Sequence, residues 1–279
     1  MIYGEIAMYT LELERFIEED LGDDDDSTGI VPEVKAKARI VCKEDGVLAG
    51  LGEACEVFGY FCTTVNKKCE DGQPVGNGDI VMEISGNAAD ILRAERLSLN
   101  FLGRMSGIAT LTAKCVAKAP QGVRVAATRK TTPGFRKFEK KAVRLGGGDA
   151  HRYDLSSAVM IKDNHIAVMG IEGSLAAAKK AASFTKKIEI EVESVEDAIK
   201  AAKLGADIIM FDNMKPKVIA EGVKRVKKVN PKIIIEASGG ITVENIGEYA
   251  RTGVDVISLG ALTRDAKWLD FSLDVEIGK

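Results

Sequence analysis

Short apolar runs rich in β-branched residues alternate with amphipathic stretches through the second half of the 279-residue chain. Helical patterns lie between most of these runs. Two of the predicted helices end at a glycine, Gly205 and Gly253, and a predicted strand follows each glycine directly. Strands and helices that alternate at this spacing indicate βα units, so we expect a short α/β barrel or an open doubly wound sheet. The six predicted strands are residues 123–127, 158–161, 187–192, 206–211, 232–237 and 254–259.

The first half of the chain has a different pattern. Residues 34–42 alternate as a half-buried strand does, and residues 71–86 predict turn-rich strands. A helical stretch at about 88–119 follows, which we expect to break near Gly103 or Gly107. The last dozen residues predict a strand that follows the α/β part and returns to the first domain.

Composition narrows the class of protein. Apolar residues make up 46% and charged residues 29%, and the net charge of −3 argues against nucleic-acid or membrane-surface binding. No apolar run is long enough to span a membrane, and no signal-peptide pattern opens the chain, so we expect the cytoplasm. The five cysteines are odd in number and include no CxxC pair, which favours small buried side chains over a metal site or disulfides.

Polar side chains and glycines follow the predicted strands. The carboxyl ends of the strands form the active face of barrels and open α/β sheets, so groups from six strands are expected to meet at one rim. Chance would produce one or two such strand ends, and six favour a functional site. The groups are Thr128, Arg129, Lys130, Lys162, Asp163, Asn164, His165, Glu191, Glu193, Asp212, Asn213, Ser238, Gly239, Gly240 and Gly260.

Residues 128–152 concentrate eight lysines and arginines and one histidine against two acidic residues. Part of this stretch predicts a helix, because Phe135, Phe138, Ala142 and Leu145 form an apolar stripe at helical spacing. Five basic residues facing away from the stripe are interpreted as a solvated helix face: Arg136, Lys137, Lys140, Lys141 and Arg144. A second basic set flanks the strands and is expected to bind an anion at the rim: Arg129, Lys130, His151, Arg152 and Lys162.

Two kinds of anion fit this rim. Residues 237–241 and 258–262 place glycines and small residues after consecutive strands, as loops that offer backbone N–H groups to a phosphate do. Glu191 and Asp212 supply hard oxygen ligands nearby, which suggests Mg²⁺ shared with a pyrophosphate. The separate set of Arg, Lys and His suits a planar carboxylate, which arginine binds through two parallel hydrogen bonds.

These motifs resemble those of the quinolinate phosphoribosyltransferase family. The resemblance covers nearly the whole chain, and its most specific part is TRKTTPG followed by GGG, HR and IKDNH. It implies an incomplete, TIM-like α/β barrel at 108–266 and an N-terminal α/β sandwich domain at 1–107, joined by 267–279. It also implies a homodimer or homohexamer in which the neighbouring N-terminal domain completes each active site. The matching segments are residues 94–110, 128–152, 158–165, 191–194, 211–214 and 237–241.

The family reaction joins the nitrogen of quinolinate to the ribosyl carbon of phosphoribosyl pyrophosphate and releases pyrophosphate. Loss of carbon dioxide then gives nicotinate mononucleotide for NAD biosynthesis. The resemblance implies catalytic roles for Lys162, Glu191 and Asp212, with the acidic pair near the ribose and Mg²⁺. It implies that the substrate is bound by Arg96, donated across the dimer, and by Thr128, Arg129, Lys130, His151, Arg152 and Lys162. The phosphate loops match Ser238, Gly239, Gly240, Leu259, Gly260 and Ala261.

One departure from the family pattern and several alternatives stay open. Residues 19–29 are longer than the Gly-Asp-x-Thr arrangement usual in the family, so Asp26 and Thr28 receive no role. A nicotinate phosphoribosyltransferase shares the barrel plan but takes a monocarboxylate, and the number of cations at the rim favours quinolinate. Lys162 could instead form a Schiff base in a sugar-phosphate lyase, and a silent phosphoribosyl-pyrophosphate sensor is the non-enzyme alternative.

Overall fold

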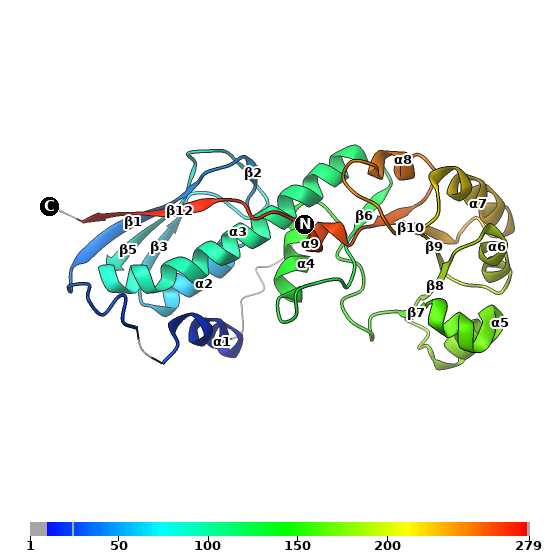
Figure 1. Ribbon diagram of the computed structural model, residues 1–279, viewed down its shortest axis with the longest axis horizontal. Helices are drawn as coiled ribbons and strands as arrows, with labels where there is room; N and C mark the ends of the chain where they lie inside the picture. The colour runs from blue at the N-terminus through cyan, green and yellow to red at the C-terminus, as the bar shows by residue number, and fades with distance from the viewer. Residues whose placement is uncertain (1–9, 24, 278–279) are drawn as a thin grey trace. The chain divides into compact units, whose positions relative to one another are not determined.

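A computed structural model describes residues 10–23 and 25–277 and divides the chain into two compact units. One unit comprises residues 1–110 and 266–279, and the other comprises residues 111–265. Each unit has a main sheet of its own (Figure 1). None of the described helices is both long and apolar enough to cross a bilayer.

The first unit is built on a four-stranded antiparallel sheet in the order β12-β1-β5-β3. Its central strand β1 (Lys35–Cys42) pairs with β5 (Ile80–Asn87) and with β12 (Phe271–Ile277), the strand predicted at the end of the chain. Along the first six residues of β1 exposed and buried side chains alternate, as expected for a strand with one solvated face. The other elements are α1 (Thr10–Leu21), β2 (Gly46–Val47), α2 (Leu51–Tyr60), β3 (Thr64–Lys67), β4 (Pro74–Val75) and the first part of α3 (Ala88–Lys118).

Helix α3 runs without a break through both glycines at which a break was predicted, so that prediction is wrong. The two glycines permit close packing instead. A Cβ atom at Gly103 would lie 3.0 Å from the backbone oxygen of Leu269, and one at Gly107 would collide with the backbone oxygen of Lys267. The absence of two side chains therefore lets the segment before β12 lie directly against the helix.

The second unit is a six-stranded sheet in the order β6-β11-β10-β9-β8-β7, and every neighbouring pair is parallel. The edge strands β6 and β7 do not pair with each other in the described sheet, so the α/β barrel is incomplete, as predicted. All six strands predicted from the apolar runs are present: β6 (Arg124–Ala126), β7 (Val159–Ile161), β8 (Ile188–Val192), β9 (Ile208–Asp212), β10 (Ile234–Ser238) and β11 (Val256–Ser258).

Helices connect these strands and lie along the outer side of the sheet (Figure 1). Gly205 and Gly253 adopt the left-handed conformation predicted for them, with φ of 77° and 91°. Such a residue ends the helix and turns the chain into the next strand, and glycine adopts it without a steric penalty. The helices are α4 (Arg136–Leu145), α5 (Asp163–Ala181), α6 (Val195–Lys203), α7 (Pro216–Val229), α8 (Ile246–Ala250) and α9 (Ala261–Arg264).

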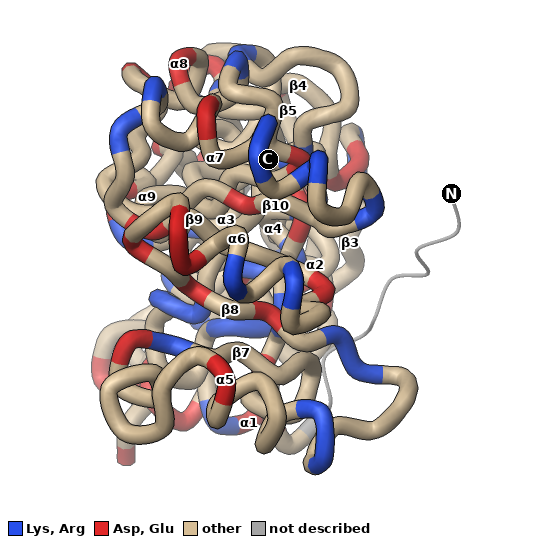
Figure 2. Tube along the Cα trace, turned by 90° about the vertical axis from the view of Figure 1, so that its right-hand side faces the viewer, with Lys and Arg blue, Asp and Glu red and all other residues tan. Residues whose placement is uncertain are grey.

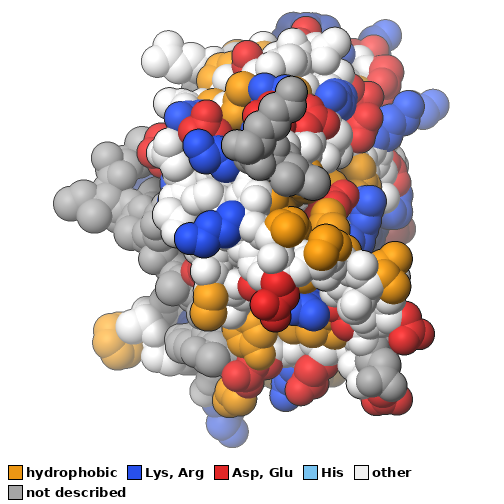
Figure 3. Space-filling model, turned by 90° about the vertical axis from the view of Figure 1, so that its left-hand side faces the viewer, with side chains coloured by type: hydrophobic (Ala, Val, Ile, Leu, Met, Phe, Trp, Pro, Cys, Tyr) orange, Lys and Arg blue, Asp and Glu red, His pale blue; other side chains and the backbone are white. Residues whose placement is uncertain are grey.

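Charged, neutral and apolar residues are mixed along the chain (Figure 2) and on the face drawn as a space-filling view (Figure 3). Basic and acidic positions are interleaved along the trace in Figure 2, and the apolar side chains visible in Figure 3 lie among charged and neutral ones. Among the cysteines, Cys42 and Cys115 are buried as predicted. Cys55 and Cys69 are only partly buried and Cys62 is exposed, so the prediction of buried cysteines is wrong for Cys62.

Candidate active site

A cavity of about 420 Å³ opens at the carboxyl ends of the barrel strands. The sheet brings together residues that lie more than a hundred positions apart in the sequence, because parallel strands end at the same rim. Nine of the predicted site residues line it: Thr128, Arg129, Lys130, His151, Arg152, Lys162, Glu191, Asp212 and Ser238. The remaining lining residues are Ala127, Met160, Met210, Glu236 and Ser258.

One wall of the cavity carries a lysine and two carboxylates. The Nζ atom of Lys162, directly after β7, lies 2.7 Å from Oε2 of Glu191 on β8. Asp212 ends β9, where burial and the neighbouring charge of Glu191 raise the pKa of its carboxyl group, against the opposing effects of Lys162 and Lys130. Two acidic side chains in a half-buried site therefore repel each other, and a bound cation would relieve that repulsion.

Two guanidinium groups face the same cavity. Burial, together with the like charge of Arg129, lowers the pKa of Arg152. Nη2 of Arg152 lies 3.1 Å from the sulfur of Met160, which is a weak acceptor. Nε of Arg129 is buried and has no hydrogen-bond partner among the described residues. An unpaired buried donor is costly, so this pair of cations fits a bound anion that accepts several hydrogen bonds.

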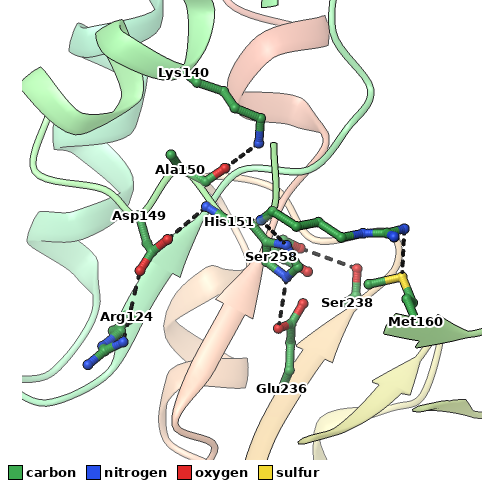
Figure 4. Close-up of polar contacts among 10 residues, drawn as sticks. Arg124, Lys140, Asp149, Ala150, His151, Met160, Glu236, Ser238 and Ser258 are labelled. Atoms are coloured by element: carbon green, nitrogen blue, oxygen red, sulfur yellow. Dashed lines mark hydrogen bonds and ion pairs between the residues drawn. The ribbon is translucent and has the colours of Figure 1, made fainter. Parts of the chain in front are cut away.

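His151 lines the same cavity, and its ring points toward Glu236 (Figure 4). Its Nδ1 atom accepts the backbone N–H of Arg152 at 2.8 Å, so the ring proton of neutral His151 lies on Nε2. Nε2 is 3.3 Å from Oε2 of Glu236 and donates to that carboxylate. One ring edge is thus held by the backbone and the other by a buried acid.

The two predicted phosphate loops differ in the groups they offer. After β10, Gly239 and Gly240 both have positive φ, 87° and 60°. After β11, the N–H of Leu259 donates to the backbone oxygen of Ala126 at 2.9 Å, so this group is already used within the sheet. A Cβ atom at Gly260 would lie 2.9 Å from Cδ of Lys130, which shows that the glycine also makes room for that side chain. A phosphate role for the set Ser238, Gly239, Gly240, Leu259, Gly260 and Ala261 stays a prediction.

One predicted site residue lies outside the second unit altogether. Arg96 is exposed on the part of α3 that belongs to the first unit, and the cavity lining does not include it. Its role at a neighbouring site stays a prediction.

Sequence reasoning missed two buried acids. Glu189 and Glu236 are only 1% and 2% exposed, and one carboxylate oxygen of each has no hydrogen-bond partner among the described residues. Ligand atoms of these two acids and of His151 lie within 4.8 Å of one another. The signal was available in the sequence, because Glu189 precedes Glu191 by two positions and Glu236 precedes Ser238 by two. Residues two apart on a strand face the same side, here the barrel interior.

The interpretation of the basic helix as a solvated face needs one correction. Lys140 of α4 is 1% exposed, and its Nζ donates to the backbone oxygen of Ala150. The buried face of the helix therefore extends beyond the predicted apolar stripe and includes Lys140, whose side chain reaches the segment that carries His151. Arg144, one turn further along, is exposed as predicted.

The buried lysine predicts how stability depends on pH. Burial lowers the pKa of Lys140 from 10.5 to about 8, and the charge of Arg136 adds to this effect. Between these pH values the unfolded chain keeps a proton that the folded chain has lost, so the free energy of unfolding rises with pH. The rise should reach at most about 3 kcal/mol relative to Lys140→Met. Urea unfolding of both proteins between pH 7.5 and about 10.5 measures it.

Arg144→Met is the matched control, because it removes an exposed cation from the same helix and should keep the pH-dependent rise. Parallel pH profiles for the parent protein and Lys140→Met would contradict the assignment of a depressed pKa to this lysine.

A second cavity, of about 720 Å³, opens toward the amino ends of the strands. It shares three lining residues with the first cavity, His151, Arg152 and Glu236. The chemistry-bearing residues gather at the smaller cavity, whereas the larger one is lined by strand-start residues such as Arg124 and Lys187. We therefore place the candidate active site at the smaller cavity.

Comparisons with known proteins place relatives along most of the chain. Residues 108–274 match the family model described as quinolinate phosphoribosyl transferase, C-terminal domain, and residues 21–106 match the model of the N-terminal domain. The chain is 53% identical over 251 residues to a probable nicotinate-nucleotide pyrophosphorylase (carboxylating) of Archaeoglobus fulgidus, covering 88% of this chain and 96% of that protein.

Two further relatives are similar over almost their whole length. A probable nicotinate-nucleotide pyrophosphorylase (carboxylating) of Methanothermobacter thermautotrophicus is 44% identical over 271 residues, covering 94% of this chain and 97% of that protein. The crystal structure of NadC from Streptococcus pyogenes has a TM-score of 0.90 at 40% identity and covers 96% of both chains.

Proposed function

This chain belongs to the quinolinate phosphoribosyl transferase family, and we propose how its residues divide the work of that reaction. The enzyme transfers the phosphoribosyl group of phosphoribosyl pyrophosphate to quinolinate and releases pyrophosphate and carbon dioxide. Nicotinate mononucleotide, a precursor in NAD biosynthesis, is the product. The observation that carries our division of roles is the cavity in which Arg129, Arg152 and Lys162 face the acidic pair Glu191 and Asp212.

The cations bind the two adjacent carboxylates of quinolinate. Arg129 and Arg152 present planar donors, which suit carboxylates because two parallel N–H groups meet two oxygens. The unpartnered Nε of Arg129 supports this role, since a carboxylate would satisfy it. Thr128, Lys130 and His151 line the same cavity and complete the polar surroundings of the ring.

Glu191 and Asp212 face the ribose and the pyrophosphate group. We propose that they hold Mg²⁺ there, because both are oxygen donors and the raised pKa of Asp212, caused by burial and by Glu191, reports an excess of negative charge. When bound, Mg²⁺ neutralises charge on the leaving pyrophosphate. The glycine turns around Gly240 and Gly260 are proposed to contact the phosphate groups through the backbone.

The protein contributes orientation and electrostatic stabilisation. The site holds the ring nitrogen next to the ribosyl carbon, so the bond forms between two groups of one complex and the entropic part of the activation barrier falls. The carboxylates Glu191 and Asp212 stabilise the positive charge that develops on the ribose as pyrophosphate leaves. The ribosylated ring is cationic and accepts the electron pair of the broken C–C bond as carbon dioxide leaves, while Lys162 offsets the negative charge that develops on the ring carbon.

Assembly and compartment belong to the same proposal. We propose a homodimer or homohexamer in which Arg96, exposed on α3, completes the active site of a neighbouring chain. The cytoplasm is the proposed compartment, in keeping with the absence of a disulfide among the five cysteines, all of which lie in the described part of the chain.

Substrate choice and metal dependence test the proposal together. With phosphoribosyl pyrophosphate and Mg²⁺, quinolinate should give carbon dioxide and nicotinate mononucleotide. The rate should be at least about 100-fold above that with nicotinate, because nicotinate lacks one carboxylate and leaves a buried cation without its partner. EDTA should abolish the reaction and excess Mg²⁺ should restore it. Release of labelled carbon dioxide and of pyrophosphate measures both effects. Equal rates with nicotinate, or full activity in EDTA, would contradict the proposal.

A further inference from the structure

The residues that carry His151 and Arg152 form no regular structure. They follow α4 and precede β7, and the only β-pairing of this described segment is an isolated bridge between Asp149 and Ala126. His151 itself has a φ of 55°, in the left-handed region that a non-glycine residue adopts only when its surroundings impose it. The orientation of two cavity-lining side chains must therefore be set by individual side-chain contacts and not by regular secondary structure.

Side chains hold this segment from two directions (Figure 4). From α4, the Nζ of Lys140 donates to the backbone oxygen of Ala150. Within the segment, Oδ1 of Asp149 accepts the backbone N–H of His151 at 2.7 Å. From β10, Oε2 of Glu236 accepts the Nε2–H of His151 at 3.3 Å.

These contacts are rigid because both distant partners are buried. Lys140 is 1% exposed and Glu236 is 2% exposed, so neither side chain has alternative positions in solvent. Lys140 is not among the residues that line the cavity, whereas Glu236 lines it together with His151 and Arg152. The effect of Lys140 on the cavity must therefore pass through the segment that carries His151 and Arg152, and Glu236 adds a hydrogen bond that holds the His151 ring.

We propose that Lys140 and Glu236 are positioning residues that orient His151 and Arg152 toward the carboxylates of the pyridine substrate. This inference rests on the proposed function. It predicts that loss of either group weakens binding of quinolinate, because the cations are displaced, and leaves binding of phosphoribosyl pyrophosphate nearly unchanged.

Lys140→Met and Glu236→Met test the proposal, since methionine keeps approximate length and volume but neither donates nor accepts strongly. Each should raise the KM for quinolinate by roughly tenfold or more, a common result of misplacing a binding group, and change the KM for phosphoribosyl pyrophosphate less than twofold. Glu236→Gln keeps an accepting oxygen for His151 and should recover most of the affinity for quinolinate. Arg144→Met, on the exposed face of α4, is the matched control.

Three results separate the possible failures. If the parent enzyme does not convert quinolinate, the proposed function fails before any variant is compared. If the parent is active and both methionine variants keep the KM for quinolinate within twofold, the positioning role is overturned. A variant that unfolds at lower temperature and raises the KM values of both substrates equally would also overturn the positioning role, because that pattern indicates a general structural role.

Discussion

Lys162→Ala is expected to lower kcat by two to three orders of magnitude while leaving the fold intact, the range found when one preorganised polar group is removed from an active site. Lys162 stands directly after β7 with its Nζ 2.7 Å from Glu191, and its side chain is 45% exposed. Its removal leaves no cavity in the core, so thermal unfolding should change little. Steady-state rates of carbon dioxide release, with circular dichroism as the check on folding, measure the effect.

Lys180→Ala provides the control for Lys162→Ala, because it removes an exposed lysine from α5, away from the cavity. It should retain the activity of the parent. A kcat of Lys162→Ala within a few-fold of the parent would show that this ammonium group does not take part in the chemistry.

The same lysine separates transferase from lyase chemistry. A Schiff-base lysine must attack as a free amine, whereas Nζ of Lys162 lies 2.7 Å from Oε2 of Glu191, in an ion pair. Membership of the phosphoribosyl transferase family likewise favours the transferase over both the lyase and the silent sensor.

Arg129→Ala is expected to reduce kcat/KM for quinolinate by roughly 30- to 1,000-fold, which corresponds to about 2–4 kcal/mol for loss of one partner of a buried charged pair. Arg129 lies three residues after the end of β6 and lines the cavity, and its buried Nε has no hydrogen-bond partner among the described residues. The main change should be in KM, because the interaction exists as soon as the substrate binds. Initial rates at varied quinolinate concentration measure it.

Arg129→Lys serves as the geometric comparison. A lysine keeps the charge but cannot make two parallel hydrogen bonds, so we expect it to restore only part of the lost affinity. Full recovery with lysine would mean that charge alone is needed. A KM unchanged in Arg129→Ala would remove this residue from the carboxylate site.

The strand ends were predictable because the repeating pattern determines them. Each apolar run of β-branched residues predicts a buried parallel strand, and the polar group that follows it is thereby placed at the carboxyl end. Lys162, Glu191 and Asp212 follow from this argument, and the structure brings all three to one cavity. Residues 19–29 could not be assigned in this way, because they contain no apolar run that predicts a strand and so fixes the place of their acidic side chains.

The predictions that Lys140 is solvated and that α3 breaks at a glycine were wrong for a common reason. A helical stripe shows which face of a helix is apolar, but it does not show what a long polar side chain on the other face will reach. The carbonyl of Ala150 accepts from Lys140 only because the loop after α4 folds back over the helix. The glycines of α3 likewise look like helix breakers until the segment before β12 lies against them.

The order of apolar and polar residues by itself determined the six strands, their parallel arrangement and the set of charged groups at their ends, because strand periodicity and strand polarity are local properties. Only the tertiary structure decided that Glu189 and Glu236 lie beneath the rim, and that Glu236 and Lys140 hold the segment carrying His151 and Arg152. Burial and hydrogen bonding between distant residues depend on how the sheet curves and where loops return. Those properties arise from the packing of the whole barrel and are not written in any single stretch of residues.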